Sequence, residues 1–531
     1  MLFQTPTFVV FFAIFLVLYL LTQGRLRLQN ALILVGSYVF YAAWDERFLV
    51  LIIASTATDF LAGSGASGRR LTNGEIGRSA AYLVGGSLLP LLPTLPQSGS
   101  YLAAVVVFAA FLSGLAHLGR RIHDDERRQY FYITLSVCVN LGVLGVFKYF
   151  NFFADSLVAT LAQLGVENVS WTTLEIVLPV GISFYTFQTI SYSIDVHRGD
   201  VEPSDRLLEF AAFVAFFPQL VAGPVERAKH LLPQFFEDRR IERKAIETGL
   251  TLFVWGLFKK TVVADNLAGI VDPIFADPSA MTTGDLAAGL LAFAFQIYGD
   301  FSGYSDMARG IARILGFEIM LNFNLPYFAR TPSEFWERWH ISLSSWLRDY
   351  LYIPLGGNRN GVAMTYRNLM LTMLLGGLWH GAAWTFVLWG AYQGGILVLY
   401  RMAGVDAWVA RFGDRATPAA RRGLDVVLTG SMFVLVLLGW MIFRADDLNV
   451  LGTYLAGLVD FSRGFASERI GDVLFFIAPL LVVQAIQVWK GRLEIFPDLP
   501  PFARLNLALF VLVSILFMQP FQTGAFIYFD F

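Results

Sequence analysis

The chain has 531 residues, of which 56% are hydrophobic and only 15% are charged. A soluble domain carries roughly 25% charged residues, and a mean hydropathy of +0.58 over the whole length is too high for one buried core. The composition therefore predicts an all-α polytopic membrane protein. A net charge of −2 provides no basic surface for nucleic acid. The single cysteine, Cys138, excludes an internal disulfide and a thiolate metal cluster.

Apolar runs recur along the chain, from Phe8–Leu21 near the N-terminus to Leu505–Met518 near the C-terminus. The runs are continuous, so they predict membrane helices and not the alternating strands of a β-barrel. A helix needs about 20 apolar residues to cross the bilayer. Several of these runs are shorter, and we predict that they are tilted, broken or re-entrant pieces packed against protein.

The loops indicate how the first spans are oriented. Residues Met1–Thr7 contain no Lys or Arg and no cleavage site follows, so the first apolar run is predicted to be a membrane helix and not a signal peptide. Arginines follow the first, third and fifth runs, which predicts that these loops are cytoplasmic and that the N-terminus faces out. The segment Gly63–Gly68 has the letters G-x-G-x-x-G. It follows an apolar helix and leads into Arg69 and Arg70, so we predict a flexible cytoplasmic loop and no dinucleotide site.

The middle of the chain differs from both ends. Between Pro179 and Gly390, apolar stretches are interrupted by Pro, Gly and charge, as in Phe216–Gln219 and Tyr298–Asp306. Irregular polar backbone persists at membrane depth only where protein encloses it or where it lines a cavity. We therefore predict one integrated membrane domain with three regions: an N-terminal scaffold over 1–150, a catalytic core over 151–400, and C-terminal transmembrane helices over 401–531.

His340 lies in a predicted amphipathic helix that begins at Thr331. Thr331 is the expected N-cap and Glu334 closes a capping box. The helix is expected to run to Tyr350, with Trp336, Trp339 and His340 on one aromatic face. Such a helix lies at an interface or lines a pocket. A core histidine that donates to a carbonyl is an equally good interpretation of His340.

His380 lies in an otherwise uncharged apolar stretch, Leu374–Trp384. An ionisable group at membrane depth is costly, so it is a candidate for function. Burial favours the neutral imidazole, which is the form a general base needs. A structural histidine that bonds across helices and a proton relay in a transporter are the alternatives.

Other chemistry is not indicated by the remaining patterns. The six histidines show no H-x-x-x-H or H-x-E spacing, so no metal site is predicted. The chain contains no Walker A sequence, and Gly299–Gly303 does not match the G-x-S-x-G nucleophile motif. The residues by themselves therefore predict a membrane-embedded, aromatic-lined site built around one or two neutral histidines.

An ordered set of motifs resembles the membrane-bound O-acyltransferase (MBOAT) family, and within it the bacterial alginate O-acetyltransferase branch. The motifs cover most of the chain, in the order Pro179–Gln188, Phe217–Pro224, Tyr298–Asp306, Asn322–Tyr327, Phe335–Ser344, Gly377–Gly381 and Phe526–Phe531. The resemblance implies many transmembrane and re-entrant helices around a central tunnel. It maps the catalytic histidine to His380 and a second polar position to His340. The candidates for substrate and tunnel contacts are Trp336, Trp339, Trp379, Asn322, Asp300 and Ser302.

The resemblance also implies a reaction and its setting. An acyl thioester enters from the cytoplasm, with acetyl-CoA as the implied donor substrate and no bound cofactor. The acyl group passes to a hydroxyl of an exported polysaccharide such as alginate, with the help of periplasmic partner proteins. The implied location is the bacterial inner membrane. The alternatives are a relative of the teichoic-acid D-alanyl transferases, which use an acyl carrier protein, and a non-enzymatic transporter or scaffold of polysaccharide export.

Overall fold

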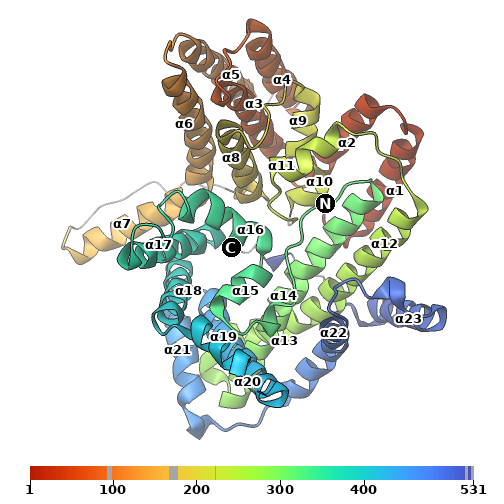
Figure 1. The fold of residues 1–531 in the computed structure, drawn as a ribbon, viewed down its shortest axis with the longest axis vertical. Helices are drawn as coiled ribbons and strands as arrows, with labels where there is room; N and C mark the ends of the chain where they lie inside the picture. The colour runs from red at the N-terminus through yellow and green to blue at the C-terminus, as the bar shows by residue number, and fades with distance from the viewer. Residues whose placement is uncertain are drawn as a thin grey trace. The chain divides into compact units, whose positions relative to one another are not determined.

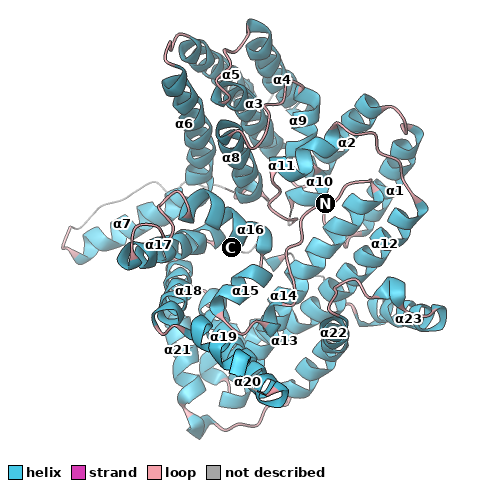
Figure 2. Cartoon of the chain, viewed as in Figure 1, coloured by secondary structure: helices cyan, strands magenta, loops and turns pink. Residues whose placement is uncertain are grey.

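A computed structural model describes residues 1–91, 99–166, 177–221, 223–415, 417–520, 524, 526 and 527, and every element within these ranges is helical (Figure 2). Ala222 and residues 528–531, which belong to two of the quoted motifs, lie outside the described residues. The chain divides into two compact units. Unit 1 is Met1–Gly249 with Ala308–Met320, and unit 2 is Leu250–Met307 with Leu321–Phe531. The boundaries predicted at residues 150 and 400 stay a prediction.

Six helices in the described residues are long and apolar enough to cross a membrane. They are Glu46–Ala66, Tyr101–Arg120, Asp125–Gln163, Pro418–Arg444, Arg469–Lys490 and Pro501–Met518. Other apolar helices are too short to cross, such as the 16 residues of α1. The chain therefore contains both long spans and short apolar helices, and the predicted helical, multi-pass fold class is confirmed.

Unit 1 is built around one buried helix, α3, in which 89% of the candidate span is buried, against 17–33% in the other five spans. Helix α3 packs against α4, α6 and α8 (Figure 1). The longer helices of unit 1 are α1 (Pro6–Leu21), α2 (Leu26–Ala42), α3 (Leu49–Ala66), α4 (Asn73–Leu91), α5 (Gly99–Arg120), α6 (Asp125–Leu144), α7 (Phe150–Gln163) and α8 (Ile182–Arg198). The shorter ones are α9 (Leu207–Val214), α10 (Phe217–Leu220) and α11 (Ala228–Leu231).

The prediction of a flexible loop at Gly63–Gly68 is wrong for most of that segment. Helix α3 continues to Ala66, and its last turn is buried. A Cβ added to Gly63 would lie 2.4 Å from the ring of Tyr192, and one added to Gly65 would lie 2.1 Å from the ring of Tyr132. The glycines therefore serve close packing of tyrosine rings on α3, which a pattern of letters cannot distinguish from a loop.

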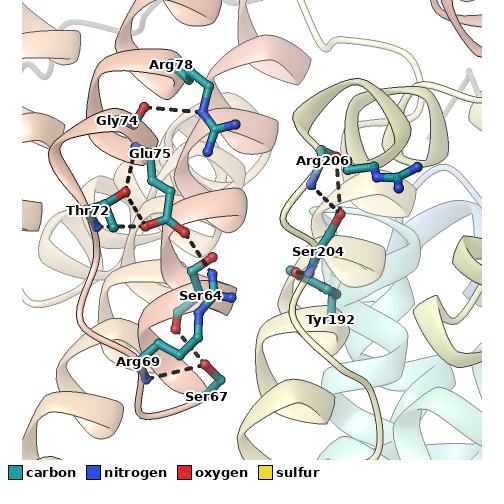
Figure 3. Close-up of polar contacts among 10 residues, drawn as sticks. All are labelled: Ser64, Ser67, Arg69, Thr72, Gly74, Glu75, Arg78, Tyr192, Ser204 and Arg206. Carbon is teal, nitrogen blue, oxygen red and sulfur yellow. Dashed lines mark hydrogen bonds and ion pairs between the residues drawn. The ribbon is translucent and has the colours of Figure 1, made fainter. Parts of the chain in front are cut away.

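The turn between α3 and α4 is held by a capping box (Figure 3). Glu75 accepts from the Thr72 backbone N–H at 2.7 Å, and the Glu75 N–H donates to the Thr72 hydroxyl at 3.2 Å. Arg69 adds an ion pair to Glu75 at 2.7 Å. The reciprocal bonds between Thr72 and Glu75 define where α4 starts.

On α8, the Tyr192 hydroxyl accepts from the Ser204 N–H at 2.9 Å.

Unit 2 contains the segment predicted to be irregular at Tyr298–Asp306, and that prediction is wrong. Helix α14 runs without a break from Thr283 to Ile314. Its glycines permit close helix packing, because a Cβ on Gly303 would lie 2.7 Å from the carbonyl oxygen of Gly256. The prediction for Phe216–Gln219 is confirmed only at Phe216, which lies between α9 and α10, because Phe217–Gln219 belong to the four-residue α10.

The other helices of unit 2 follow in chain order. They are η5 (Lys259–Ala264), α13 (Asp265–Ala276), η6 (Pro278–Ala280), η7 (Pro326–Phe328), α15 (Pro332–Arg338), α16 (Ile341–Leu347), η8 (Arg348–Tyr352), α17 (Val362–His380), α18 (Trp384–Met402), α19 (Val405–Arg415), α20 (Pro418–Arg444), α21 (Leu448–Val459), η9 (Phe461–Arg463), α22 (Arg469–Lys490), η10 (Phe496–Asp498) and α23 (Pro501–Met518). Helix α12 (Arg243–Phe258) contributes residues to both units.

Candidate active site

His380 is the last residue of α17, at the tip of a tight helical hairpin with α18. The two helices approach so closely that side chains are excluded between them. A Cβ on Gly377 would lie 2.2 Å from the carbonyl oxygen of Phe386, and one on Gly390 would lie 2.5 Å from that of Met373. Gly377 and Gly390 therefore let α18 pack closely against α17.

The His380 side chain is surrounded by aromatic rings. It is 4% exposed, with ring centroids 5.0 Å from Trp389 and 5.2 Å from Phe443, both edge-on. Trp389 comes from α18 and Phe443 from α20. The hairpin thus places the imidazole of His380 in an apolar, aromatic surrounding.

His340 lies at a break between two short helices, and the predicted single helix from Thr331 to Tyr350 is wrong. The predicted N-cap at Thr331 is confirmed, because the Glu334 N–H donates to the Thr331 hydroxyl at 3.3 Å. Helix α15, however, ends at Arg338, and α16 starts at Ile341. His340 itself has φ 43° and ψ 53°, in the left-handed region. Residues other than Gly rarely adopt this conformation, and its strain persists only where the surroundings impose it.

Asn322 imposes the break. Its carbonyl oxygen accepts from the Ile341 N–H at 2.9 Å, and its Oδ1 accepts from the Ser342 hydroxyl at 2.6 Å. Its Nδ2 donates to the Ser305 hydroxyl of α14 at 3.0 Å. The first residues of α16 are therefore bonded to a segment outside the helix. These contacts position the turn at His340, and a substrate contact for Asn322 stays a prediction.

The His340 ring is fully buried, at 0% exposed. Its centroid lies 4.6 Å from that of Phe301 on α14 and 5.8 Å from that of Trp379. Burial lowers the pKa of His340 to about 3, so its imidazole is neutral at physiological pH. Trp379 directly precedes His380, so the structure brings both predicted histidines to one indole.

The predicted tryptophans join the same set of rings. Trp336 lies 5.8 Å from Trp389, and Trp339 lies 4.7 Å from Trp440. We define the aromatic cluster as Phe301, Trp336, Trp339, Trp379, Trp389, Trp440 and Phe443. Three of these residues, Trp336, Trp339 and Trp379, were predicted from the sequence as site residues.

Asp300 and Ser302 have partners of a different kind. Asp300 forms an ion pair with Lys260 at 2.6 Å, and Lys260 also pairs with Asp265 at 2.8 Å. The second oxygen of Asp300 accepts from the Ile527 N–H at 2.7 Å. Ser302 accepts from Lys259 at 3.0 Å. A substrate contact for Asp300 and Ser302 stays a prediction, because these contacts are with lysines of η5 and with Ile527.

Several members of the site were not predicted. Trp389, Trp440 and Phe443 come from helices that read as ordinary membrane spans, and an aromatic residue in such a helix carries no local sign of its partners. Lys260 lies in an apolar run, where a buried lysine could have indicated a paired carboxylate. In the described part of the chain, no three His, Cys, Asp or Glu side chains are grouped closely enough to hold a metal ion.

Two buried histidines, His340 and His380, thus border one aromatic cluster of a multi-pass helical protein. A buried imidazole of this kind is suited to proton transfer. The membrane-bound O-acyltransferase family pattern matches residues 204–435, which include both histidines. The "Probable alginate O-acetylase AlgI" of Azotobacter vinelandii is 43% identical over 471 residues, covering 88% of this chain and 80% of the relative. The protein of the same name from Pseudomonas aeruginosa is 42% identical over 469 residues, covering 88% and 76%. The "Peptidoglycan O-acetyltransferase" of Helicobacter pylori is 35% identical over 372 residues, covering 64% and 67%.

The chain therefore belongs to the membrane-bound O-acyltransferase family and is an O-acyltransferase. This confirms the predicted family and the predicted class of enzyme.

Proposed function

We propose that this O-acyltransferase moves an acetyl group from acetyl-CoA on the cytoplasmic side of the bacterial inner membrane to hydroxyls of an exported polysaccharide. Alginate is the proposed acceptor, and periplasmic proteins are the proposed partners that complete the transfer. The observation that carries the proposal is the placement of His340 and His380 on one buried indole, Trp379. The acceptor is taken from the relatives named alginate O-acetylases, which are 42% and 43% identical to this chain.

His380 is proposed as the general base. One ring nitrogen takes the proton of the acceptor hydroxyl while the hydroxyl oxygen attacks the thioester carbonyl. The new C–O bond forms, the C–S bond breaks, and the proton passes from the imidazolium to the departing thiolate. General-base help of this kind contributes about 10²–10⁴-fold to the rate.

His340 is proposed to assist this step without taking the proton. A neutral imidazole carries one N–H donor, which can orient the acceptor or stabilise the oxyanion that develops on the carbonyl oxygen. Its buried position on Phe301 and Trp379 fixes the ring, so a hydrogen bond from it requires little reorganisation during the reaction.

The purified protein in proteoliposomes with radiolabelled acetyl-CoA tests this proposal. Thioester cleavage and transfer of label to added alginate are measured for wild type, His380→Ala and His340→Ala. His117→Ala, which changes an exposed histidine on α5, is the matched control, and monodisperse elution checks folding. We expect His380→Ala to lose about 10²-fold or more of the rate, and His117→Ala to match wild type.

The other outcomes separate the alternatives. An active wild type matched by His380→Ala would show that His380 is not the base. Activity that requires an acylated carrier protein and ignores acetyl-CoA would identify a relative of the D-alanyl transferases. Transfer to alginate that begins only after a periplasmic extract is added would support the proposed partner proteins and make this chain one half of a relay. No thioester cleavage under any condition would favour a transporter or a scaffold.

A further inference from the structure

A short amphipathic helix that follows the α17–α18 hairpin has no part in the proposed acyl transfer. Helix α19 begins at Val405, three residues after the last residue of α18, and packs against α18 (Figure 1). Its side chains Trp408 and Phe412 lie one helical turn apart, with stacked rings whose centroids are 5.6 Å apart. The two side chains are 47% and 37% exposed. The ring pair therefore forms an apolar surface outside the protein core.

The chain places α19 at the edge of the bilayer. Helix α20, a candidate membrane span, begins at Pro418, three residues after Arg415, the last residue of α19. The two helix ends are therefore at most about 11 Å apart. On α20, Val426 is 72% exposed, and a valine this exposed on a membrane span faces lipid. Arg422 precedes Val426 by about 6 Å along the helix axis, so the start of α20 lies where water meets hydrocarbon.

Exposed arginines accompany the ring pair. Arg401 lies in the last turn of α18, Arg411 on α19, and Arg421 and Arg422 near the start of α20. Within the described residues, none of these four guanidinium groups forms an ion pair with a carboxylate, whereas Arg330 of the same unit pairs with both Glu334 and Asp425. The sequence from residue 401 to residue 422 contains five arginines and two aspartates. This part of the surface therefore carries an excess of positive charge.

We propose that Arg401, Trp408, Arg411, Phe412, Arg421 and Arg422 form an interfacial surface that binds anionic phospholipid headgroups. The two aromatic rings enter the boundary between headgroups and acyl chains, where aromatic side chains gather in membrane proteins. Guanidinium groups form charge-assisted, bidentate hydrogen bonds with phosphates, and arginines clustered beside a membrane span attract anionic lipid. Arginine excess in a short loop is typical of the cytoplasmic side, so the bound lipid belongs to the cytoplasmic leaflet.

A second exposed aromatic pair provides a comparison within the same unit. Phe461 and Phe465 are both exposed and stack with ring centroids 5.4 Å apart. The charges beside them balance, because residues 460–469 contain two acidic residues and two arginines, and Arg463 pairs with Asp460 at 3.3 Å. Any lipid contact of this pair should therefore show no preference for a charged headgroup.

Photocrosslinking of the purified full-length protein in nanodiscs tests the surface. The discs contain equal amounts of phosphatidylglycerol and phosphatidylcholine, with a trace of a diazirine-labelled form of one lipid or the other, and mass spectrometry locates the crosslinks. We expect phosphatidylglycerol to label residues 401–422 at least about fivefold more than phosphatidylcholine, since one arginine near an anionic surface contributes about this factor. Residues 460–469 should show equal labelling by the two lipids. High salt should reduce the preference at residues 401–422.

Charge and aromatic variants separate the two parts of the surface. The combined variant Arg401→Gln, Arg411→Gln, Arg421→Gln, Arg422→Gln should bring the labelling ratio close to one. The control for charge is Arg243→Gln, an exposed arginine paired with Glu247, which should keep the wild-type ratio. Trp408→Ser with Phe412→Ser should lower labelling of residues 401–422 by both lipids. The control for aromatic loss is Phe461→Ser with Phe465→Ser, which should leave that labelling unchanged.

Equal labelling of residues 401–422 by both lipids in wild type, or an unchanged ratio in the four-arginine variant, would overturn the proposal. Absence of labelling by either lipid would also overturn it, and would show that protein covers the ring pair. If the four-arginine variant does not elute as a monodisperse protein, the salt dependence of wild type decides, because a preference that persists at high salt contradicts binding by exposed charge. These measurements report lipid contact and not acyl transfer, so they are independent of the proposed function.

Discussion

Trp379 contacts His340 across the chain, with ring centroids 5.8 Å apart, and is the residue before His380 in α17. One indole therefore borders the two imidazoles that are 40 positions apart in the sequence. A shift of the Trp379 indole would change the surroundings of both histidines together. Within the aromatic cluster, we therefore expect activity to depend most on the shape of Trp379.

Trp379→Leu is expected to lower kcat by about 10–100-fold while the protein stays folded, since displacement of a reacting group by about 1 Å costs on this scale. Trp379→Phe keeps a ring and should retain more of the rate. Both variants are measured in the proteoliposome assay with acetyl-CoA and alginate. If the two variants lose the same activity, the volume of the ring is not what positions the histidines.

The buried position of His340 allows a prediction about how kcat/KM depends on pH. Burial lowers the pKa of His340 to about 3, so the neutral form is present at every pH above that value and is lost only as the pH falls through it. An acid limb of kcat/KM between pH 5 and 7 must then belong to another group. His340→Gln should lower the rate at all pH values and leave the midpoint of the acid limb unchanged. A shifted midpoint would show that His340 titrates in this range.

Asn322→Ala removes the side chain that bonds Ser305 and Ser342. It leaves buried polar groups without those bonds, at a cost of about 1–3 kcal/mol, and it weakens the turn that holds His340, where only the backbone bond from the Ile341 N–H to residue 322 is kept. We expect a lower unfolding temperature and lower kcat together. Asn506→Ala, at an exposed position on α23, is the control and should change neither. Wild-type stability for Asn322→Ala would contradict the positioning role.

Lys260→Met leaves the buried carboxylates of Asp265 and Asp300 without their shared cation. Breaking a buried ion pair from one side costs about 3–5 kcal/mol, so the yield of folded protein should fall sharply. The triple variant Lys260→Met, Asp265→Asn, Asp300→Asn removes all three charges and should recover most of that yield. Size-exclusion profiles compare the variants. A single variant as stable as wild type would show that the cluster adds nothing to folding.

Two glycines on α18, Gly390 and Gly395, test whether close packing of α17 and α18 is needed for the hairpin that carries His380. A Cβ on Gly390 would lie 2.5 Å from the Met373 carbonyl oxygen, whereas one on Gly395 meets nothing within 4 Å. Gly390→Ala should separate α17 from α18 and reduce both folding yield and activity. Gly395→Ala should be neutral or slightly stabilising, by up to about 1 kcal/mol. Equal behaviour of the two variants would exclude close helix packing as the reason for Gly390.

Features of the site that depend on neighbouring residues in the sequence could be predicted. The capping of α15 at Thr331 depends on residues within one turn, and the sequence contains all of them. His380 was singled out because a lone ionisable group in an apolar run is unusual without reference to any partner. The family motifs identified the enzyme class, and the comparisons confirm it.

The class of a helical, multi-pass O-acyltransferase could be predicted from the amino-acid sequence, as could the candidates His340 and His380. Three features became clear from the folded chain: Tyr298–Asp306 is helical, the predicted helix breaks at His340, and Trp389 and Phe443 surround His380. These features depend on partners distant in the sequence: Gly256 against α14, Asn322 against α16, and α20 against the hairpin. Periodicity reports which face of a helix is apolar, but it does not report which helix packs there, because that choice is made by contacts between segments.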